Sequence, residues 1–263
     1  IPNPYKTSAT GIDNMIYGPD EIGSYGPQQV PCKAGTYLDE RGGESQDDCK
    51  DCEEGYYCPQ GSPEMVACPL GFYCEPKAEQ PTPCPVGTFG EKLYLTVKEE
   101  CTDCTKGYYC DSVGLLQPRG PCDPGYVCPG TNGGAKESNP TDGLTGYVCP
   151  EGGYCPAGTY EPWGCPPGTF SSSTEQVDAS DCEVCTPGFF CSEPGKPDVT
   201  GECIEGCYCE GTTPESPDRG AYHECQDPCP QGHYCPRASP LPIQCPRGTY
   251  QPQDRKEFCL PCP

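Results

Sequence analysis

The side chains of this 263-residue chain that could do chemistry are its 27 cysteines. Four phrases share a Cys-x-x-Gly start without a closing cysteine and begin at Cys32, Cys84, Cys165 and Cys245. Eight phrases read C-x-x-G-x-x-C, mostly with aromatic residues before the closing cysteine, and they begin at Cys52, Cys68, Cys104, Cys122, Cys149, Cys185, Cys203 and Cys229. Cysteine thiols form disulfides, bind zinc or act as nucleophiles, so the spacing has to decide among these three.

Disulfide formation is the chemistry that the spacing favours. Zinc sites built from cysteine often add histidine, but the chain has only His223 and His233, and its CxxC pairs lie in a repeat typical of disulfide modules. A catalytic thiol needs a positioned base, and no nucleophile motif is present. We therefore expect no enzyme and no cofactor. Calcium at the acidic stretches near Asp48 and Glu100 is a weaker alternative to solvated loops, because no calcium-loop spacing is present.

The composition predicts how the chain must be held together. Leu, Ile, Val and Phe make up only about 12% of it, and the formal net charge is -23, a combination typical of chains that stay disordered. A disulfide closing a 15-residue loop contributes about 3 kcal/mol by reducing the entropy of the unfolded chain, so a dozen can replace an apolar core. We expect a small disulfide-rich fold: tandem cysteine-rich repeats forming an elongated rod of short β-ribbons and turns, with little helix and no large hydrophobic core.

The same features predict where the protein works. Disulfides in such number persist in oxidising compartments, so the chain is expected to be secreted or on a cell surface. It starts at Ile1, which predicts a cleaved signal peptide or excision from a longer chain, and no apolar run is long enough to span a bilayer. The 39 acidic against 16 basic residues argue against binding nucleic acid.

Glycosylation is expected to be O-linked if it occurs. Two asparagines precede proline and the other two lack Ser or Thr two residues on, so no N-linked acceptor exists. The candidate stretches for O-linked glycans are 171–174, 212–213 and, if its prolines are hydroxylated, 80–85.

The order of the cysteines predicts four repeats. Sixteen residues separate Cys32 from Cys49, and the same spacing recurs twice, whereas thirteen separate Cys245 from Cys259. The second cysteine of each pair opens a CxxC, so the repeats are expected at 32–83, 84–164 and 165–244, with an incomplete one at 245–263 that leaves Cys262 without its partner. Each repeat is too small to bury a core alone.

Residues 1–31 contain no cysteine and differ from the rest. One interpretation is a linker from a preceding domain. The other is an arm that docks on another subunit and orders there, with its apolar and aromatic groups as the contact. These groups are Ile12, Met15, Ile16, Tyr17 and Tyr25.

The frame C-x-x-G-T-[YF], a spacer and C-x-x-C-x-x-G-[YF] resembles the ephrin-receptor-like cysteine-rich repeat, which is related to growth-factor-receptor and tumour-necrosis-factor-receptor modules. It covers residues 32–263 and occurs in animal receptors and in surface proteins of protists and algae, including mastigoneme-like fibre proteins. The resemblance implies a loop-closing disulfide in each repeat, and the recurring spacing agrees with it: Cys32–Cys49, Cys84–Cys101, Cys165–Cys182 and Cys245–Cys259.

For the next four cysteines of a repeat, the resemblance implies interlocked pairs, first with third and second with fourth. Sequence cannot establish this, because six cysteines allow fifteen connectivities. The implied pairs are Cys52–Cys68, Cys58–Cys74, Cys104–Cys122, Cys110–Cys128, Cys185–Cys203 and Cys191–Cys209. The pairing is left open for Cys149, Cys155, Cys207, Cys225, Cys229, Cys235 and Cys262.

We expect an extracellular structural protein whose copies join end to end in a surface fibre, such as a flagellar appendage. Head-to-tail contacts between unlike ends do not close on themselves, which is why they build filaments. The alternative is the stalk or ligand-binding ectodomain of a receptor. The structural interpretation is favoured because no repeat carries an unusual aromatic or basic patch suited to one ligand.

Overall fold

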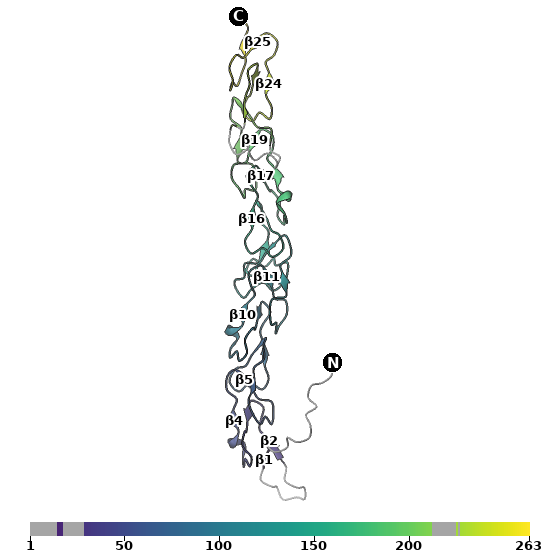
Figure 1. Ribbon diagram of the computed structural model, residues 1–263, viewed down its shortest axis with the longest axis vertical. Coiled ribbons are helices and arrows are strands. Elements are labelled where there is room, and N and C mark those ends of the chain that lie inside the picture. The colour runs from purple at the N-terminus through teal and green to yellow at the C-terminus, as the bar shows by residue number, and fades with distance from the viewer. Residues whose placement is uncertain (1–14, 18–28, 212–224, 226) are drawn as a thin grey trace. The chain divides into compact units, whose positions relative to one another are not determined.

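The computed structural model describes residues 15–17, 29–211, 225 and 227–263, with side chains from Val30 onward. Its contacts divide the chain into two units, residues 1–105 with 110–119 and residues 106–109 with 120–263. In each unit, short antiparallel strand pairs follow one another along the chain (Figure 1). The fold is therefore the disulfide-rich one expected, built from small hairpins.

The first unit contains five of the strand pairs. They are β1 (Met15–Tyr17) with β2 (Gln29–Pro31), β3 (Thr36–Tyr37) with β4 (Lys50–Asp51), β5 (Tyr56–Tyr57) with β6 (Val66–Ala67), β7 (Phe72–Tyr73) with β8 (Thr82–Pro83), and β9 (Thr88–Phe89) with β10 (Thr102–Asp103). Two 3₁₀ turns, η1 (Gln46–Asp48) and η2 (Lys98–Glu100), lie in its longer loops.

The second unit contains eight pairs and the 3₁₀ turn η3 (Ala179–Asp181). The pairs are β11 (Tyr108–Tyr109) with β12 (Gly120–Pro121), β13 (Tyr126–Val127) with β14 (Tyr147–Val148), β15 (Gly153–Tyr154) with β16 (Trp163–Gly164), β17 (Thr169–Phe170) with β18 (Glu183–Val184), β19 (Phe189–Phe190) with β20 (Gly201–Glu202), β21 (Cys207–Tyr208) with β22 (Asp227–Pro228), β23 (His233–Tyr234) with β24 (Ile243–Gln244), and β25 (Thr249–Tyr250) with β26 (Leu260–Pro261).

One rule places every strand after Cys32. The first strand of a pair follows directly after the glycine of a Cys-x-x-Gly phrase, and the second strand directly precedes the next phrase. We call that glycine the turn glycine. Each one has a positive φ, for example +85° at Gly35 and +88° at Gly188, a region that glycine enters without steric cost. The repeated glycine therefore reverses the chain at the start of each hairpin.

The core is divided into small clusters, each centred on a disulfide. Phe89 packs on Cys104 and Cys110 in the first unit, and Val127 packs on Cys149 and Cys155 in the second. Most of the fully buried large side chains are half-cystines. Such clusters contribute little apolar burial, so the covalent cross-links must supply much of the stability.

Candidate functional site

Thirteen disulfides join the cysteines of the described residues. Four of them close the long loops, in the pairs that the repeat spacing predicts: Cys32–Cys49, Cys84–Cys101, Cys165–Cys182 and Cys245–Cys259. Their Cα atoms lie 5.8 or 5.9 Å apart, within the range that a disulfide spans.

The interlocked pairing is wrong. Cys52 is bonded to Cys58 and Cys68 to Cys74, so each C-x-x-G-x-x-C phrase closes on itself. The pairs Cys104–Cys110, Cys122–Cys128, Cys185–Cys191 and Cys203–Cys209 repeat the pattern, as do the previously unassigned Cys149–Cys155 and Cys229–Cys235. The reason is the turn glycine, whose left-handed backbone brings the two ends of the seven-residue phrase together.

Two of the remaining three cysteines form the thirteenth disulfide, and the third is unpaired. Cys207, inside the phrase CIEGCYC, bonds to Cys225, eighteen positions later. Cys262 is exposed and is the free cysteine of the described residues, in agreement with its expected missing partner.

Backbone hydrogen bonds, with the turn glycine at their centre, join successive hairpins. The closing position, three residues after the turn glycine, is a cysteine in eight hairpins and Leu38, Gly90, Ser171 or Gln251 in the other four. The N–H of a turn glycine donates to the carbonyl of the next hairpin's closing position at 2.7–2.9 Å. Eleven such bonds are present among the described residues, each within one unit, from Gly35 to Cys58 through Gly232 to Gln251.

The carbonyl of the same glycine is used as regularly. It accepts the N–H of the opening cysteine of the next phrase, at 2.8–3.0 Å. Cys52 donates to Gly35 in this way, and Cys262 donates to Gly248. Both polar groups of the turn glycine therefore bind the following hairpin, whatever side chains that hairpin carries.

A second left-handed residue recurs two to four positions after each closing position, and we call it the left-handed residue. In nine hairpins its N–H donates to the carbonyl of the opening cysteine of the preceding phrase, as from Lys77 to Cys52 at 2.8 Å. Five of the six non-glycine residues with positive φ among those described occupy this position: Lys77, Tyr94, Glu175, Ala238 and Arg255. Such a backbone costs about 1 kcal/mol outside glycine, so the surrounding bonds must impose it.

The carbonyl of the left-handed residue covers the turn glycine two hairpins earlier. A Cβ on Gly188 would lie 2.6 Å from the oxygen of Ala238, and a Cβ on Gly206 would lie 2.6 Å from that of Arg255. Eight turn glycines would place a Cβ within 3.0 Å of such an oxygen. Two features therefore require glycine at this position: the backbone conformation and the close approach of another hairpin.

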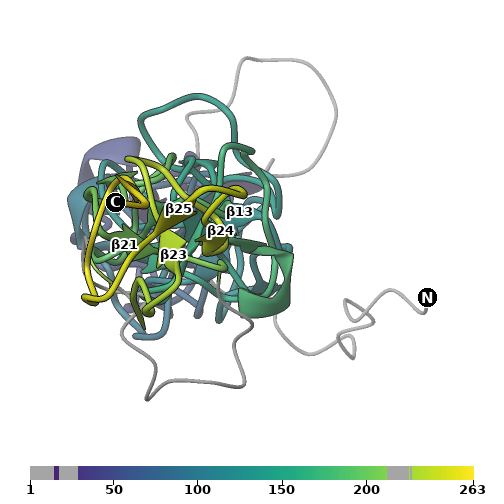
Figure 2. The same ribbon diagram turned by 90° about the horizontal axis from the view of Figure 1, so that it is seen from above.

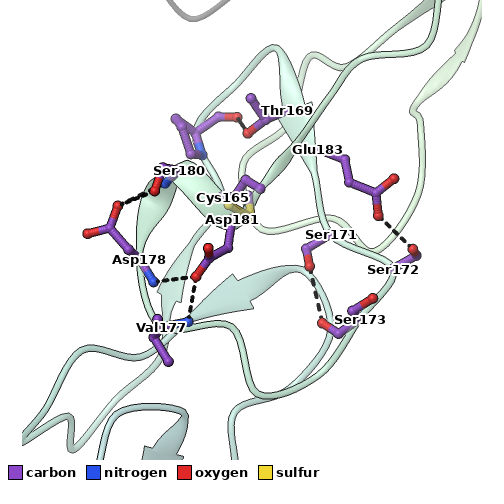
Figure 3. The surroundings of a disulfide bond; sticks show 12 residues. Cys165, Thr169, Ser171, Ser172, Ser173, Val177, Asp178, Ser180, Asp181 and Glu183 are labelled. Carbon is purple, nitrogen blue, oxygen red and sulfur yellow. Dashed lines mark hydrogen bonds between the residues drawn. A yellow bond between two sulfur atoms is a disulfide. The ribbon is translucent and has the colours of Figure 1, made fainter.

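Carboxylates order the long loops. In the loop closed by Cys165–Cys182, Asp181 Oδ2 accepts the N–H groups of Val177 and Asp178, and Asp178 Oδ1 accepts that of Ser180 (Figure 3). Asp48 does the same for Glu44 and Ser45 at the start of η1. These backbone N–H groups lower the pKa of Asp48 and of Asp178 below the usual range. Asp48, in one of the acidic stretches considered for calcium, thus caps its own loop.

A threonine replaces the local disulfide in the four phrases that lack a closing cysteine. Each has Thr directly after the turn glycine, and its hydroxyl donates to the carbonyl three residues earlier: Thr36 to Lys33, Thr88 to Pro85, Thr169 to Pro166 and Thr249 to Pro246, at 2.7 or 2.8 Å. The signal G-T-[YF] is visible in the sequence, but its role as a hydrogen-bonded staple was not foreseen.

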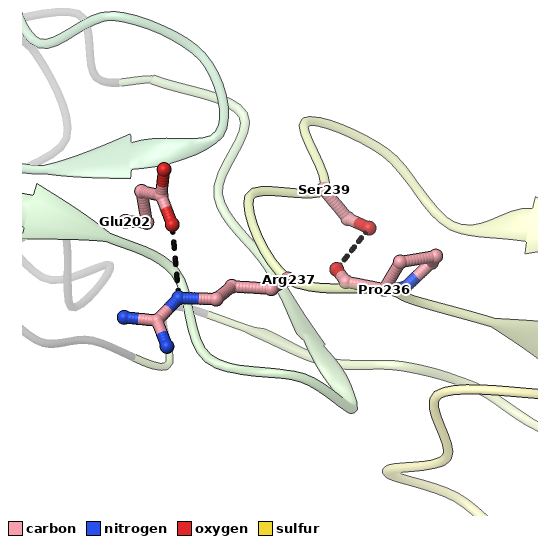
Figure 4. Close-up of polar contacts among 4 residues, drawn as sticks. All are labelled: Glu202, Pro236, Arg237 and Ser239. Carbon is pink, nitrogen blue, oxygen red and sulfur yellow. Dashed lines mark hydrogen bonds and ion pairs between the residues drawn. The ribbon is translucent and has the colours of Figure 1, made fainter.

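The ion pairs between hairpins in the described residues are exposed. Arg237 Nε lies 2.9 Å from Glu202 Oε2, and both side chains are largely solvated (Figure 4). Ser239 in the same turn donates to the Pro236 carbonyl, which orders the left-handed segment. An exposed ion pair contributes about 0 to 1 kcal/mol, so the backbone bonds and not the charges carry the contact.

The N-terminal residues follow the hairpin rule in part. Strand β1 pairs with β2, with Met15 opposite Pro31 and Ile16 opposite Val30. Because β2 directly precedes Cys32, β1 occupies the place of a first strand in a hairpin without cysteines. The backbone of Met15–Tyr17 is therefore paired within its own chain. Ile12 and Tyr25 of the expected arm lie outside the described residues.

Segments of this chain are similar to segments of two known proteins. No family model matches it. A segment of 92 residues is 33% identical to "Cysteine repeat modular protein A" of Toxoplasma gondii and covers 32% of this chain. A segment of 100 residues, 38% of the chain, is 34% identical to "Sushi, von Willebrand factor type A, EGF and pentraxin domain-containing protein 1" of Rattus norvegicus. In both cases the match spans 2% of the relative's length.

These observations agree on class and environment. Thirteen disulfides and the repeated hairpins make this a disulfide-rich cysteine-repeat protein of an extracellular or cell-surface environment. In the described part of the chain, no helix has the length and apolarity that a membrane crossing needs.

Proposed function

We propose that the chain is a structural, non-catalytic segment of an extracellular fibre, in which ephrin-receptor-like hairpin repeats form a rod. The observation that carries the proposal is the recurrence of one backbone contact between hairpins. Every turn glycine from Gly35 to Gly232 donates to the next closing position, and residues as different as Lys77, Tyr94 and Arg255 occupy the same left-handed position. Because backbone atoms make this contact, it can recur along an array of hairpins. It supplies no particular set of side chains that would recognise a ligand.

The charge pattern is consistent with a spacer. With 39 acidic and 16 basic residues, the chain is expected to stay hydrated and to repel other copies of itself sideways. Repeats that contact only their near neighbours have stabilities that add along the array, so length can grow without a larger core. Both properties suit a fibre segment better than a binding pocket.

Self-association is the part of the proposal that an experiment can decide. We propose that copies join head to tail through residues 1–31, in the manner of a heterologous contact that does not close. The strand pair of Met15–Tyr17 with Gln29–Pro31 lies within this segment, so removal of residues 1–31 removes both strands.

Electron microscopy and small-angle scattering test this. The full chain should form filaments at high concentration, and removal of residues 1–31 should shorten or abolish them while the repeats keep their disulfides. A monomer at all concentrations that binds a soluble ligand would instead favour a receptor ectodomain. A radius of gyration near the globular value of about 18 Å would contradict the rod.

A further inference from the structure

Disulfides divide the described hairpins after Cys32 into two kinds. In five hairpins a disulfide joins the Cys-x-x-Gly phrase to the far end of its own loop, one or two positions before the second strand, and we call these the locked hairpins. A covalent bond bypasses the loop of a locked hairpin, so a pull along the chain cannot draw that loop out. The five cross-links are Cys32–Cys49, Cys84–Cys101, Cys165–Cys182, Cys207–Cys225 and Cys245–Cys259.

The other seven described hairpins after Cys32 are cross-linked only within their C-x-x-G-x-x-C phrase, and we call them the releasable hairpins. They are β5–β6, β7–β8, β11–β12, β13–β14, β15–β16, β19–β20 and β23–β24. Figure 2 shows both kinds in the second unit, the releasable hairpin of β23 and β24 and the locked hairpin of β25. The pairing within phrases leaves them releasable, because a Cys52–Cys68 bond would have joined the two ends of β5–β6.

Non-covalent contacts alone hold a releasable hairpin shut. In β5–β6 the strands pair over two residues, with Tyr56 opposite Ala67. The N–H of Cys68 donates to the Gly55 carbonyl at 2.9 Å, and the N–H of Gly55 donates to the next hairpin at the same distance. A two-stranded hairpin of this size is marginally stable in water, so tension should open it while every disulfide stays intact.

The strand register gives the length that each opening releases. Cys68 lies opposite Gly55, and Cys58 lies three positions beyond Gly55 in the first strand, so the two cysteines are about 10 Å apart along the closed hairpin. The ten peptide units that join Cys58 to Cys68 span about 35 Å when extended. Opening β5–β6 therefore adds about 25 Å to the chain, and opening β13–β14, whose loop is longer, adds about 60 Å.

The two longest loops carry additional restraints. Twenty residues separate the closing cysteine from the next opening cysteine in β13–β14 and nineteen in β21–β22, against nine to eleven in the other six C-x-x-G-x-x-C hairpins. Of these eight described hairpins, β21–β22 is the one that is locked, by Cys207–Cys225. In β13–β14, Asp142 Oδ1 accepts the N–H groups of Leu144 and Thr145 at 2.9 and 2.8 Å. The loops that would release the most length are thus restrained further.

We propose that the chain is extensible under tension: the releasable hairpins open in turn and close again when the load is removed, while the locked hairpins keep their length. Closure is fast because the disulfide within each phrase keeps the turn glycine and the first strand in place, so that only the second strand has to return. Closing a ten-residue loop takes about 10–100 ns, and forming a hairpin takes about 1–10 μs. The inference goes beyond the fibre proposal and concerns a single chain, so it does not depend on filament formation.

Single-molecule force spectroscopy on the full chain without reductant tests the proposal. Peptide tags without cysteine hold the two ends, and the length is recorded while the load is raised and lowered. We expect lengthening in steps of about 25–30 Å, with one of about 60 Å from β13–β14, and the same steps in repeated cycles. A chain that does not lengthen before its attachments fail, or that does not recover its length on relaxation, would overturn the proposal.

Two double variants distinguish a lock from a cross-link within a phrase. Cys207→Ser together with Cys225→Ser makes β21–β22 releasable, and it should add one step and about 40 Å to the fully extended length. Cys68→Ser together with Cys74→Ser is the matched control, because it also removes one disulfide but should add only about 15 Å. Equal gains in the two variants would overturn the division into locked and releasable hairpins. Peptide mapping of the remaining disulfides verifies that each variant keeps its pairing.

Discussion

Replacing Gly188 by alanine should loosen the hairpins around it, and replacing Gly248 by alanine should do so much less. The two glycines have nearly the same backbone, with φ of +88° and +85°, and both start a hairpin. They differ in their surroundings, since a Cβ on Gly188 would lie 2.6 Å from the Ala238 oxygen and one on Gly248 would meet nothing within 4 Å. Gly248→Ala is thus a matched control for the cost of the backbone alone.

The expected loss of local stability in each variant has two sources, the left-handed backbone and the overlap with a carbonyl. A left-handed residue with a side chain costs about 1 kcal/mol, and this applies to both variants. Overlap with a fixed backbone carbonyl adds about 1 to 3 kcal/mol, and this applies to Gly188→Ala only. The difference between the variants corresponds to a factor of about five to about a hundred and fifty in local opening.

Amide hydrogen exchange under native conditions is the suitable assay, because a long array of repeated hairpins is not expected to unfold as one two-state unit. In Gly188→Ala, exchange should accelerate at Cys203, which donates to the residue 188 carbonyl, and at Ala238, which donates to Cys203. In Gly248→Ala, the amide to follow is Cys262, which donates to residue 248. Equal acceleration in both variants would refute the idea that the next hairpins, and not φ alone, require glycine.

Three further predictions concern the cross-links and one loop. Cyanogen bromide cleavage after Met65 without reductant should release residues 66–263 from residues 16–65, because Cys52–Cys58 and Cys68–Cys74 lie on opposite sides of the cut; a linked product would mean interlocked pairing. Full reduction should abolish the folded circular dichroism spectrum, since the apolar clusters are too small to persist alone, and a spectrum that survives would contradict this. The Thr145 hydroxyl and backbone N–H lower the pKa of Asp142 from 3.8 to about 2, so the loop stabilisation that it provides should be complete above pH 3.8 and be lost as the pH falls through about 2. A carboxyl titration by NMR with a midpoint near 3.8, or an unchanged loop in Asp142→Asn, would show that these bonds do not hold the loop.

Several features of the fold could be predicted from the sequence because they depend on local chemistry. Cysteine density with few apolar residues requires disulfides, and a glycine between two cysteines requires a turn. Three of the long-loop disulfides follow from the equal spacing of their cysteines, and the fourth, Cys245–Cys259, follows from its place at the start of the same repeat. Cys262 was expected to be unpaired from the same count.

The disulfide pairing within each C-x-x-G-x-x-C phrase could not be predicted from the sequence. Cys52 has Cys58 and Cys68 as near candidates, and the spacing does not rank them; the three-dimensional turn at Gly55 does, because it places Cys52 and Cys58 side by side. The strand pair of Met15–Tyr17 was missed for a related reason, since a hairpin without cysteines carries no visible phrase.

The sequence by itself determined which residues could cross-link and where the chain turns, because both properties belong to single residues and short spacings. Only the tertiary structure decided how the hairpins are joined. The contacts from Gly35 to Cys58 and from Gly188 to Cys209, and the seat of the Ala238 carbonyl over Gly188, are made by backbone groups that every residue has. The amino-acid sequence does not indicate which backbone groups bond to each other. The interface between hairpins could therefore be recognised only in the three-dimensional structure.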